Sequence, residues 1–216
     1  MNQAIMGAVA SSVAGGFEGT IIEQDDFTGI TINTGKWSKN DAGNSITQNN
    51  RIIMNPTLST GDRFSGYDIR TINSATSGIV TLSANYDFNA ATTNFGMIKL
   101  GSAKNSYAGI VNQYNGNNFQ LEIAEAGSLK YNVSTGISGI NQNFKVKITY
   151  DITTHDIKFF YWNGSWTQMG ITKNYNIGST LKAELMDYQF GGSASFRTYV
   201  DNLYLTEGDF ETETPT

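Results

Sequence analysis

An alternation of apolar and polar residues runs through most of the chain between residues 23 and 207. In the clearest run, 144–152, one side carries Phe, Val, Ile, Tyr and Ile, and the other side carries Lys, Lys, Thr and Asp. The runs at 80–88, 119–123 and 157–161 repeat this pattern. A period of two predicts β-strands with one buried and one polar face, as in antiparallel sheets with one solvated side. No helix of useful length is expected in this region.

Turn residues separate the predicted strands. Asn115-Gly116 and Asn163-Gly164 are strong hairpin signals, and Gly191-Gly192 marks a further loop. The segment 153–156 joins two long strands as a short polar loop. About a dozen strand candidates at regular spacing predict an all-β fold, a two-sheet antiparallel β-sandwich of the jelly-roll type. The length of 216 residues suits one such domain.

The two ends of the chain differ in composition from its middle. Residues 1–22 contain a small, apolar stretch, and no Lys or Arg precedes Lys36, so the basic start of a secretory signal is missing. We therefore predict an N-terminal arm over 1–22 that contacts another protein chain, a jelly-roll domain over 23–207 and a flexible tail over 208–216. No apolar run approaches the roughly 18 residues of a membrane span.

Composition removes several classes of function. The chain has no cysteine, which excludes disulfides, thiolate metal sites and thiol nucleophiles. Its net charge is −5 and its Lys and Arg residues are scattered, so no basic face for nucleic acid is predicted. The abundant Asn, Thr, Ser, Gly and Gln suit a surface that hydrogen-bonds neutral polar ligands. The same composition is typical of secreted or virion β-proteins, and we predict an extracellular or virion-surface location.

Three segments, in this order, resemble the concanavalin A-like lectin and glucanase superfamily in its laminin-G-like branch. They are the opening at 25–37, with Asp25-Asp26-Phe27-Thr28-Gly29 and Lys36-Trp37, the long hairpin at 144–166, and the closing strand at 196–205. The resemblance implies a sandwich of two curved sheets. The superfamily includes sugar-binding modules, adhesion domains and glycan hydrolases, so the fold alone does not fix the function.

The resemblance also implies a structural Ca²⁺ that ties the first strand to the last. The matching positions are Asp25 or Asp26 together with Asp201. Carboxylates are the ligands that this ion prefers. No other cofactor is expected.

The usual hydrolase motif of this superfamily, E-x-D-x-x-E on one strand, is absent. Glu122 and Glu125 are three residues apart, so a regular strand directs them to opposite faces, and Glu184 and Asp187 share this spacing. If the protein is an enzyme, Glu122 and Glu184 from separate strands are the candidate acid and base. The alternative is that both are ordinary glutamates on a solvated sheet face. We predict that the protein is not an enzyme.

Sugar sites combine a flat aromatic ring with planar amides, carboxylates or Arg. The candidates here are aromatic residues on the polar side of a strand and one nearby cation. They are Arg70, Tyr114, Trp162, Trp166 and Tyr188. For Trp162 and Trp166 the alternative is a cross-strand pair in which each ring covers the other.

Three functions follow from these observations. The first is a non-catalytic, lectin-like carbohydrate-binding module in a larger assembly. The second is a structural or decoration protein of a virion or surface layer with little glycan binding. The third is a glycan hydrolase with Glu122 and Glu184 as a non-standard pair, which requires the two carboxylates to face each other.

Overall fold

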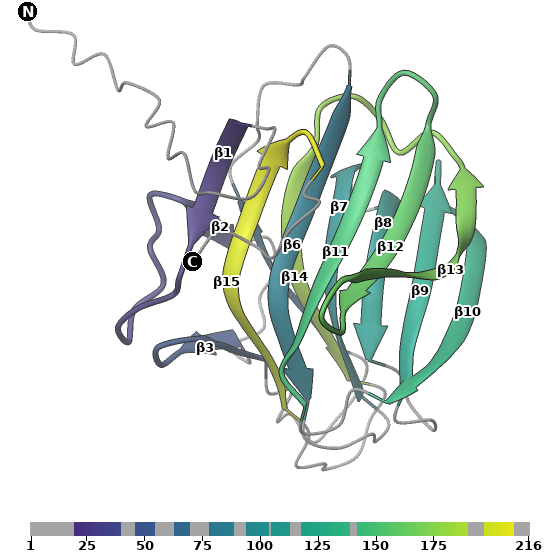
Figure 1. Cartoon of the computed structure of the whole chain (residues 1–216). Helices are drawn as coiled ribbons and strands as arrows, with labels where there is room; N and C mark the ends of the chain where they lie inside the picture. The colour runs from purple at the N-terminus through teal and green to yellow at the C-terminus, as the bar shows by residue number, and fades with distance from the viewer. Residues whose placement is uncertain are drawn as a thin grey trace, which may run out of the picture.

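Two antiparallel sheets face each other in the computed structural model of the chain (Figure 1). The structure describes residues 20–39, 46–54, 63–69, 78–88, 94–103, 105–112, 118–138, 142–189 and 197–209. No helix occurs in these ranges, so none of them contains a helix that could cross a membrane. The predicted all-β sandwich of the jelly-roll type is confirmed.

The eight-stranded sheet follows the order β13-β12-β11-β6-β15-β4-β3, with β1 paired to β15. Its strands are β1 (Thr20–Asp25), β3 (Ile46–Gln48), β4 (Ile52–Met54), β6 (Ile79–Phe88), β11 (Phe144–Asp151), β12 (Asp156–Trp162), β13 (Trp166–Asn174) and β15 (Thr198–Glu207). The first and last strands of the domain thus lie side by side, as Figure 1 shows.

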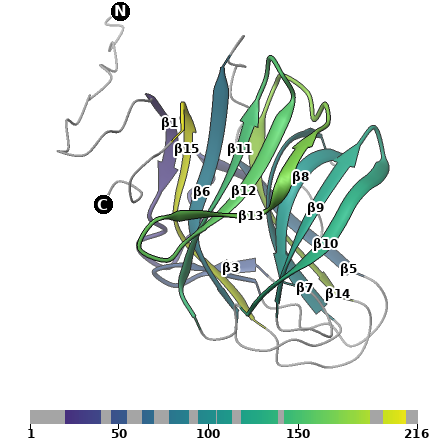
Figure 2. The same cartoon turned by 45° about the vertical axis from the view of Figure 1, so that its right-hand side comes forward.

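The seven-stranded sheet follows the order β10-β9-β8-β7-β14-β5-β2. Its strands are β2 (Trp37–Lys39), β5 (Arg63–Ile69), β7 (Asn94–Ala103), β8 (Ser106–Asn112), β9 (Asn118–Glu125), β10 (Ser128–Ser138) and β14 (Lys182–Gln189). In Figure 2 the strands β8, β9 and β10 of this sheet stand to the right of the other sheet.

The core lies between the sheets because each strand turns its apolar residues inward. Leu82 of β6 and Ile148 of β11 face Leu121 of β9 and Leu185 of β14, and all four are fully buried. The next residue on each strand must then lie on the outer face, since side chains alternate along a strand. This alternation places Lys99 and Lys147 on the outer faces of the two sheets.

Two predicted turns are present as hairpin loops. Gly164, with φ of 99°, lies between β12 and β13, and His155, with φ of 61°, lies in the loop between β11 and β12. The predicted turns at Asn115-Gly116 and Gly191-Gly192 lie outside the described residues, as does most of the predicted arm. The described part of the sandwich runs from Thr20 of β1 to Asp209, and the predicted domain bounds of 23–207 stay a prediction.

Candidate functional site

A row of polar residues crosses the outer face of the seven-stranded sheet. Strand register aligns Glu184 of β14 with Lys99 of β7, then Gly109 of β8, Glu122 of β9 and Asn132 of β10. The inward-facing neighbours Ile98, Ile110 and Leu121 belong to the core, which fixes the outward direction of the row. Residues distant in sequence are therefore brought together by pairing of the strands.

Lys99 and Glu184 form a buried ion pair at one end of this row. The Lys99 Nζ lies 3.0 Å from the Glu184 Oε2, and the two side chains are only 2% and 3% exposed. The same ammonium lies 4.7 Å from the centroid of the Tyr107 ring. Removing two charges from water is costly, and the close approach of the opposite charges offsets part of that cost. The Glu184 side chain is therefore buried in the sheet, unlike the solvated glutamate that was the alternative from the sequence.

Glu122 lies on the other side of Tyr107. The Tyr107 hydroxyl donates a hydrogen bond of 3.2 Å to Glu122 Oε2, and the Asn132 amide donates one of 3.3 Å to Oε1. Burial raises the pKa of Glu122, while the Tyr107 hydrogen bond and the charge of Lys99 pull that pKa down. Burial, together with the nearby Glu122 charge, raises the pKa of Tyr107 as well, so this hydroxyl stays a donor.

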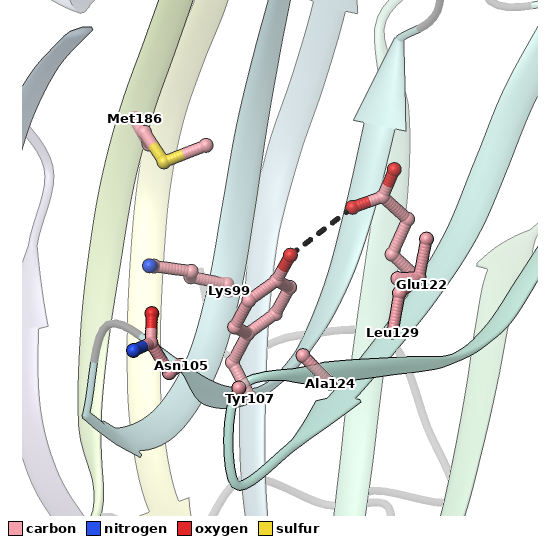
Figure 3. A pocket seen from close by; sticks show the side chains of 8 residues that line it. Lys99, Asn105, Tyr107, Glu122, Ala124, Leu129 and Met186 are labelled. Atoms are coloured by element: carbon pink, nitrogen blue, oxygen red, sulfur yellow. Dashed lines mark hydrogen bonds between the residues drawn. The ribbon is translucent and has the colours of Figure 1, made fainter.

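A shallow hollow of about 270 Å³ opens beside these groups, and we call it the Tyr107 pocket. Its lining residues are Lys99, Asn105, Tyr107, Glu122, Ala124, Gly127, Leu129 and Met186. Figure 3 shows the Tyr107 ring between Lys99 and Glu122. The Met97 side chain packs over Gly109 in this row, because a Cβ added at Gly109 would lie 2.9 Å from the Met97 Sδ. The pocket therefore combines a carboxylate, an amide and apolar carbon at one accessible surface.

Among the described residues, none of the side chains predicted to bind sugar lines this pocket. Arg70 and Tyr114 lie outside the described residues, and for Tyr188 the structure describes the backbone in β14 but not the side chain. Trp162 and Trp166 lie on the other sheet, directly opposite each other across the β12–β13 hairpin. Their rings meet edge to face with centroids 5.3 Å apart, which is the cross-strand pair considered as the alternative.

The carboxylates implied as calcium ligands approach one another at the β1–β15 junction. Burial raises the pKa of Asp201, and the charges of Asp26 and Asp25 raise it further. Asp25, however, already accepts hydrogen bonds from the Phe27 N–H at 2.8 Å and the Trp37 Nε1–H at 2.7 Å. The described residues include no group of three acidic or histidine side chains arranged to hold a metal. These residues are poorly arranged to coordinate Ca²⁺. The ion stays a prediction that rests on the resemblance to the superfamily.

Sequence reasoning identified Glu122 and Glu184 but missed Lys99, Tyr107 and Asn132. Lys99 alternates with the core residues Ile98 and Leu100, and Tyr107 precedes Ala108 in the same way, so this alternation was the available signal. Their pairing depends on which strands are neighbours, and alternation within one strand carries no information about that.

Known structures share this architecture at low sequence identity. The sequence matches no protein-family model and no curated protein. The structure is similar to the catalytic domain of an endo-1,3-β-glucanase (laminarinase) from Thermotoga petrophila RKU-1, with a TM-score of 0.62, 6% identity and coverage of 89% of this chain and 99% of that chain. A β-1,3-glucanase from Mycobacterium marinum gives a TM-score of 0.63, 14% identity and coverage of 88% and 100%.

A binding domain is similar as well. The legume lectin-like domain from Entamoeba histolytica gives a TM-score of 0.54, 14% identity and coverage of 81% of this chain and 91% of that chain. At such identities the likeness shows the fold, which hydrolases and lectin-like domains have in common. The chain has the concanavalin A-like sandwich fold of the lectin and glucanase superfamily, as the three sequence segments predicted.

Proposed function

We propose that the protein is a non-catalytic carbohydrate-binding module that holds a neutral glycan in the Tyr107 pocket. The observation that carries this proposal is the position of Glu122, a carboxylate held by Tyr107 and Asn132 at the wall of an open hollow. A fixed carboxylate accepts hydrogen bonds from sugar hydroxyls, and hydrogen bonds to charged groups are stronger than neutral ones. Leu129, which is 56% exposed, offers apolar surface for the C–H face of a sugar.

The charges in the pocket favour a neutral sugar over an acidic one. Glu122 and Lys99 line the pocket, and Glu184 pairs with Lys99 beneath it, so these three groups have a net charge of −1 when all are ionised. A carboxylated or sulfated sugar would be repelled by this net negative charge.

Two features support the absence of hydrolysis. Strands β14 and β9 are separated by β7 and β8, so the backbones at Glu184 and Glu122 are about 14 Å apart at the usual strand spacing of about 4.8 Å. A hydrolytic pair needs carboxyl groups about 5 to 9.5 Å apart with the sugar between them. Here the Lys99 ammonium and the Tyr107 ring lie between the two glutamates, and the Glu184 carboxylate is committed to Lys99.

The proposal is tested by isothermal titration calorimetry of the 216-residue chain with neutral oligosaccharides, beginning with β-1,3-glucans. A parallel assay for new reducing ends measures whether the oligosaccharides are cleaved. We expect saturable binding without new reducing ends. Glu122→Gln should weaken binding about 10- to 100-fold, the equivalent of one charged hydrogen bond of roughly 1.5–3 kcal/mol. Glu125→Gln is the matched control on the same strand, since Glu125 instead accepts a hydrogen bond from the Asn176 N–H.

Two outcomes would contradict the proposal. Release of reducing ends that disappears in Glu122→Gln would identify a hydrolase. A failure to bind any member of a broad glycan array would favour the structural or decoration role. The larger assembly, the contact through the N-terminal arm and the extracellular or virion location remain predictions from the sequence.

A further inference from the structure

A second hollow opens far from the Tyr107 pocket, and we call it the Trp37 hollow. It has a volume of about 390 Å³ and lies between β2, β3 and the segment that joins β1 to β2. Strand β2 ends the seven-stranded sheet on the side away from β9 and β10, so the two cavities are separate. The described residues that line the hollow are Ile30, Thr31, Ile32, Thr34, Trp37, Thr47 and Gln48.

Gln48 gives this hollow a fixed hydrogen-bond acceptor. The residue is only 9% exposed, and its Nε2 donates to the Phe27 carbonyl at 3.0 Å and to the Thr28 carbonyl at 2.8 Å. These two bonds use both hydrogens of the amide, which fixes its orientation and leaves Oε1 as an acceptor. No described residue donates to that oxygen. A hydroxyl group of a ligand in the hollow can therefore supply the missing hydrogen bond.

The loop at the rim of the hollow is fixed by hydrogen bonds at both of its ends. The Gly29 N–H donates to Asn50 Oδ1 at 2.9 Å, and the Asn50 N–H donates to the Gly29 carbonyl at 2.7 Å. At the other end, the Trp37 N–H donates to the Asn33 carbonyl at 2.9 Å, and the Trp37 Nε1–H donates to Asp25. A site that is already ordered loses less free energy when a ligand binds.

Every described side chain that lines the hollow is uncharged. Hydroxyl groups come from three exposed threonines, and apolar carbon comes from two isoleucines and the Trp37 ring. Ile30 is 78% exposed, the most of the large hydrophobic residues that the structure describes. Such a lining suits a neutral ligand with apolar carbon on one side and hydroxyl groups on the other. A charged ligand would lose water here without gaining an opposite charge.

We propose that the Trp37 hollow is a second carbohydrate site and that its ligand is a neutral 6-deoxyhexose such as L-fucose or L-rhamnose. A 6-deoxyhexose has a methyl group where the parent hexose has CH₂OH, and it keeps the ring hydroxyl groups. The methyl group contacts Ile30 and Ile32, and a ring hydroxyl donates to Gln48 Oε1. This site does not depend on the function proposed for the Tyr107 pocket, because the linings of the two cavities share no residue.

The test is an NMR titration of the 216-residue chain with L-fucose and with L-rhamnose. Their parent sugars, L-galactose and L-mannose, are titrated in the same way. We expect each 6-deoxyhexose to bind about fourfold more tightly than its parent, the gain from burying one methyl group. Saturation transfer from the protein should be strongest at the sugar methyl group. Equal affinities within both pairs would overturn the ligand assignment, and a failure of both 6-deoxyhexoses to bind would overturn the site.

Two pairs of variants locate the bound sugar. Thr47→Trp fills the hollow and should abolish L-fucose binding, whereas Thr172→Trp on β13 should leave it unchanged. Ile30→Ser should remove the preference for L-fucose over L-galactose, whereas Ile171→Ser, also on β13, should keep it. All four side chains are exposed, so the substitutions leave the core intact.

Glu122→Gln separates this site from the Tyr107 pocket. It should leave L-fucose binding unchanged, because Glu122 does not line the Trp37 hollow. L-Fucose binding that survives Thr47→Trp, or that disappears in Glu122→Gln, would place the sugar elsewhere and overturn the proposal. A failure of the Tyr107 pocket to bind glycans would instead appear in the oligosaccharide titration and would not alter these results.

Discussion

The two outer faces of the sandwich each bury one lysine, but they neutralise it in different ways. Lys99 pairs with Glu184 of the adjacent strand, and both side chains are almost inaccessible to solvent. Lys147 pairs with Asp209 from the end of the chain, and only the lysine is inaccessible. Aromatic rings contact both ammonium groups. The comparison teaches that a carboxylate from a neighbouring strand is buried together with its lysine, whereas a carboxylate from beyond the last strand stays in contact with solvent.

The largest effect is expected from breaking the Lys99–Glu184 pair. Glu184→Gln removes the negative charge 3.0 Å from the buried Lys99 ammonium, so the free energy of unfolding should fall by about 3–5 kcal/mol. For a chain of this size the melting temperature should fall by roughly 6–20 °C. Chemical denaturation and a thermal melt measure both values. A loss below about 1 kcal/mol would contradict a buried pair of this kind.

The double variant Lys99→Met/Glu184→Leu sharpens this result. Replacing both charges by apolar side chains of similar size is often neutral or stabilising, so most of the lost stability should return. A double variant as unstable as Glu184→Gln would show that the two charges act through other partners.

Asp209→Asn should cost less than half as much stability as Glu184→Gln. The Asp209 carboxylate is partly solvated, and ion pairs that water reaches contribute about 1 kcal/mol or less. The same denaturation experiment compares the two variants directly. Equal losses would remove the distinction between the buried pair and the pair whose carboxylate is accessible to solvent.

Glycan binding in the Tyr107 pocket should depend on pH. A sugar hydroxyl donates to the ionised form of Glu122, and burial raises the pKa of this carboxyl above its ordinary value of 4.5. Protons therefore compete with the ligand, so the dissociation constant should fall as the pH rises through the pKa of Glu122 and then level off. Calorimetry between mildly acidic and neutral pH tests this. Glu122→Gln should have a flat profile, and an equally steep profile in that variant would assign the titration to another group.

The smallest effect is expected from calcium. Both carboxylate oxygens of Asp25 already accept hydrogen bonds, so adding Ca²⁺ to chelator-treated protein should change the melting temperature by about 1 °C at most, the equivalent of a few tenths of a kcal/mol. A rise of several degrees that Asp201→Asn abolishes would establish the ion that the resemblance implies.

Alternation along single strands was enough to predict the sandwich and its core. The run at 144–152 became β11 with Ile148 inside, and Glu122 and Glu184 face outward as their phase required. The partners of the charged groups could not be predicted in the same way. Lys99 meets Glu184 through the register of β7 and β14, and Asp209 reaches Lys147 across strands far apart in sequence. Such contacts depend on strand order, which a local pattern does not contain.

The most direct test of the central claim is a crystal structure of the chain soaked with a neutral β-1,3-gluco-oligosaccharide. The account predicts an intact oligosaccharide in the Tyr107 pocket, with a sugar hydroxyl on Glu122 and the Lys99–Glu184 pair unbroken. A cleaved sugar, or an intact one bound at another surface with the Tyr107 pocket unused, would contradict it.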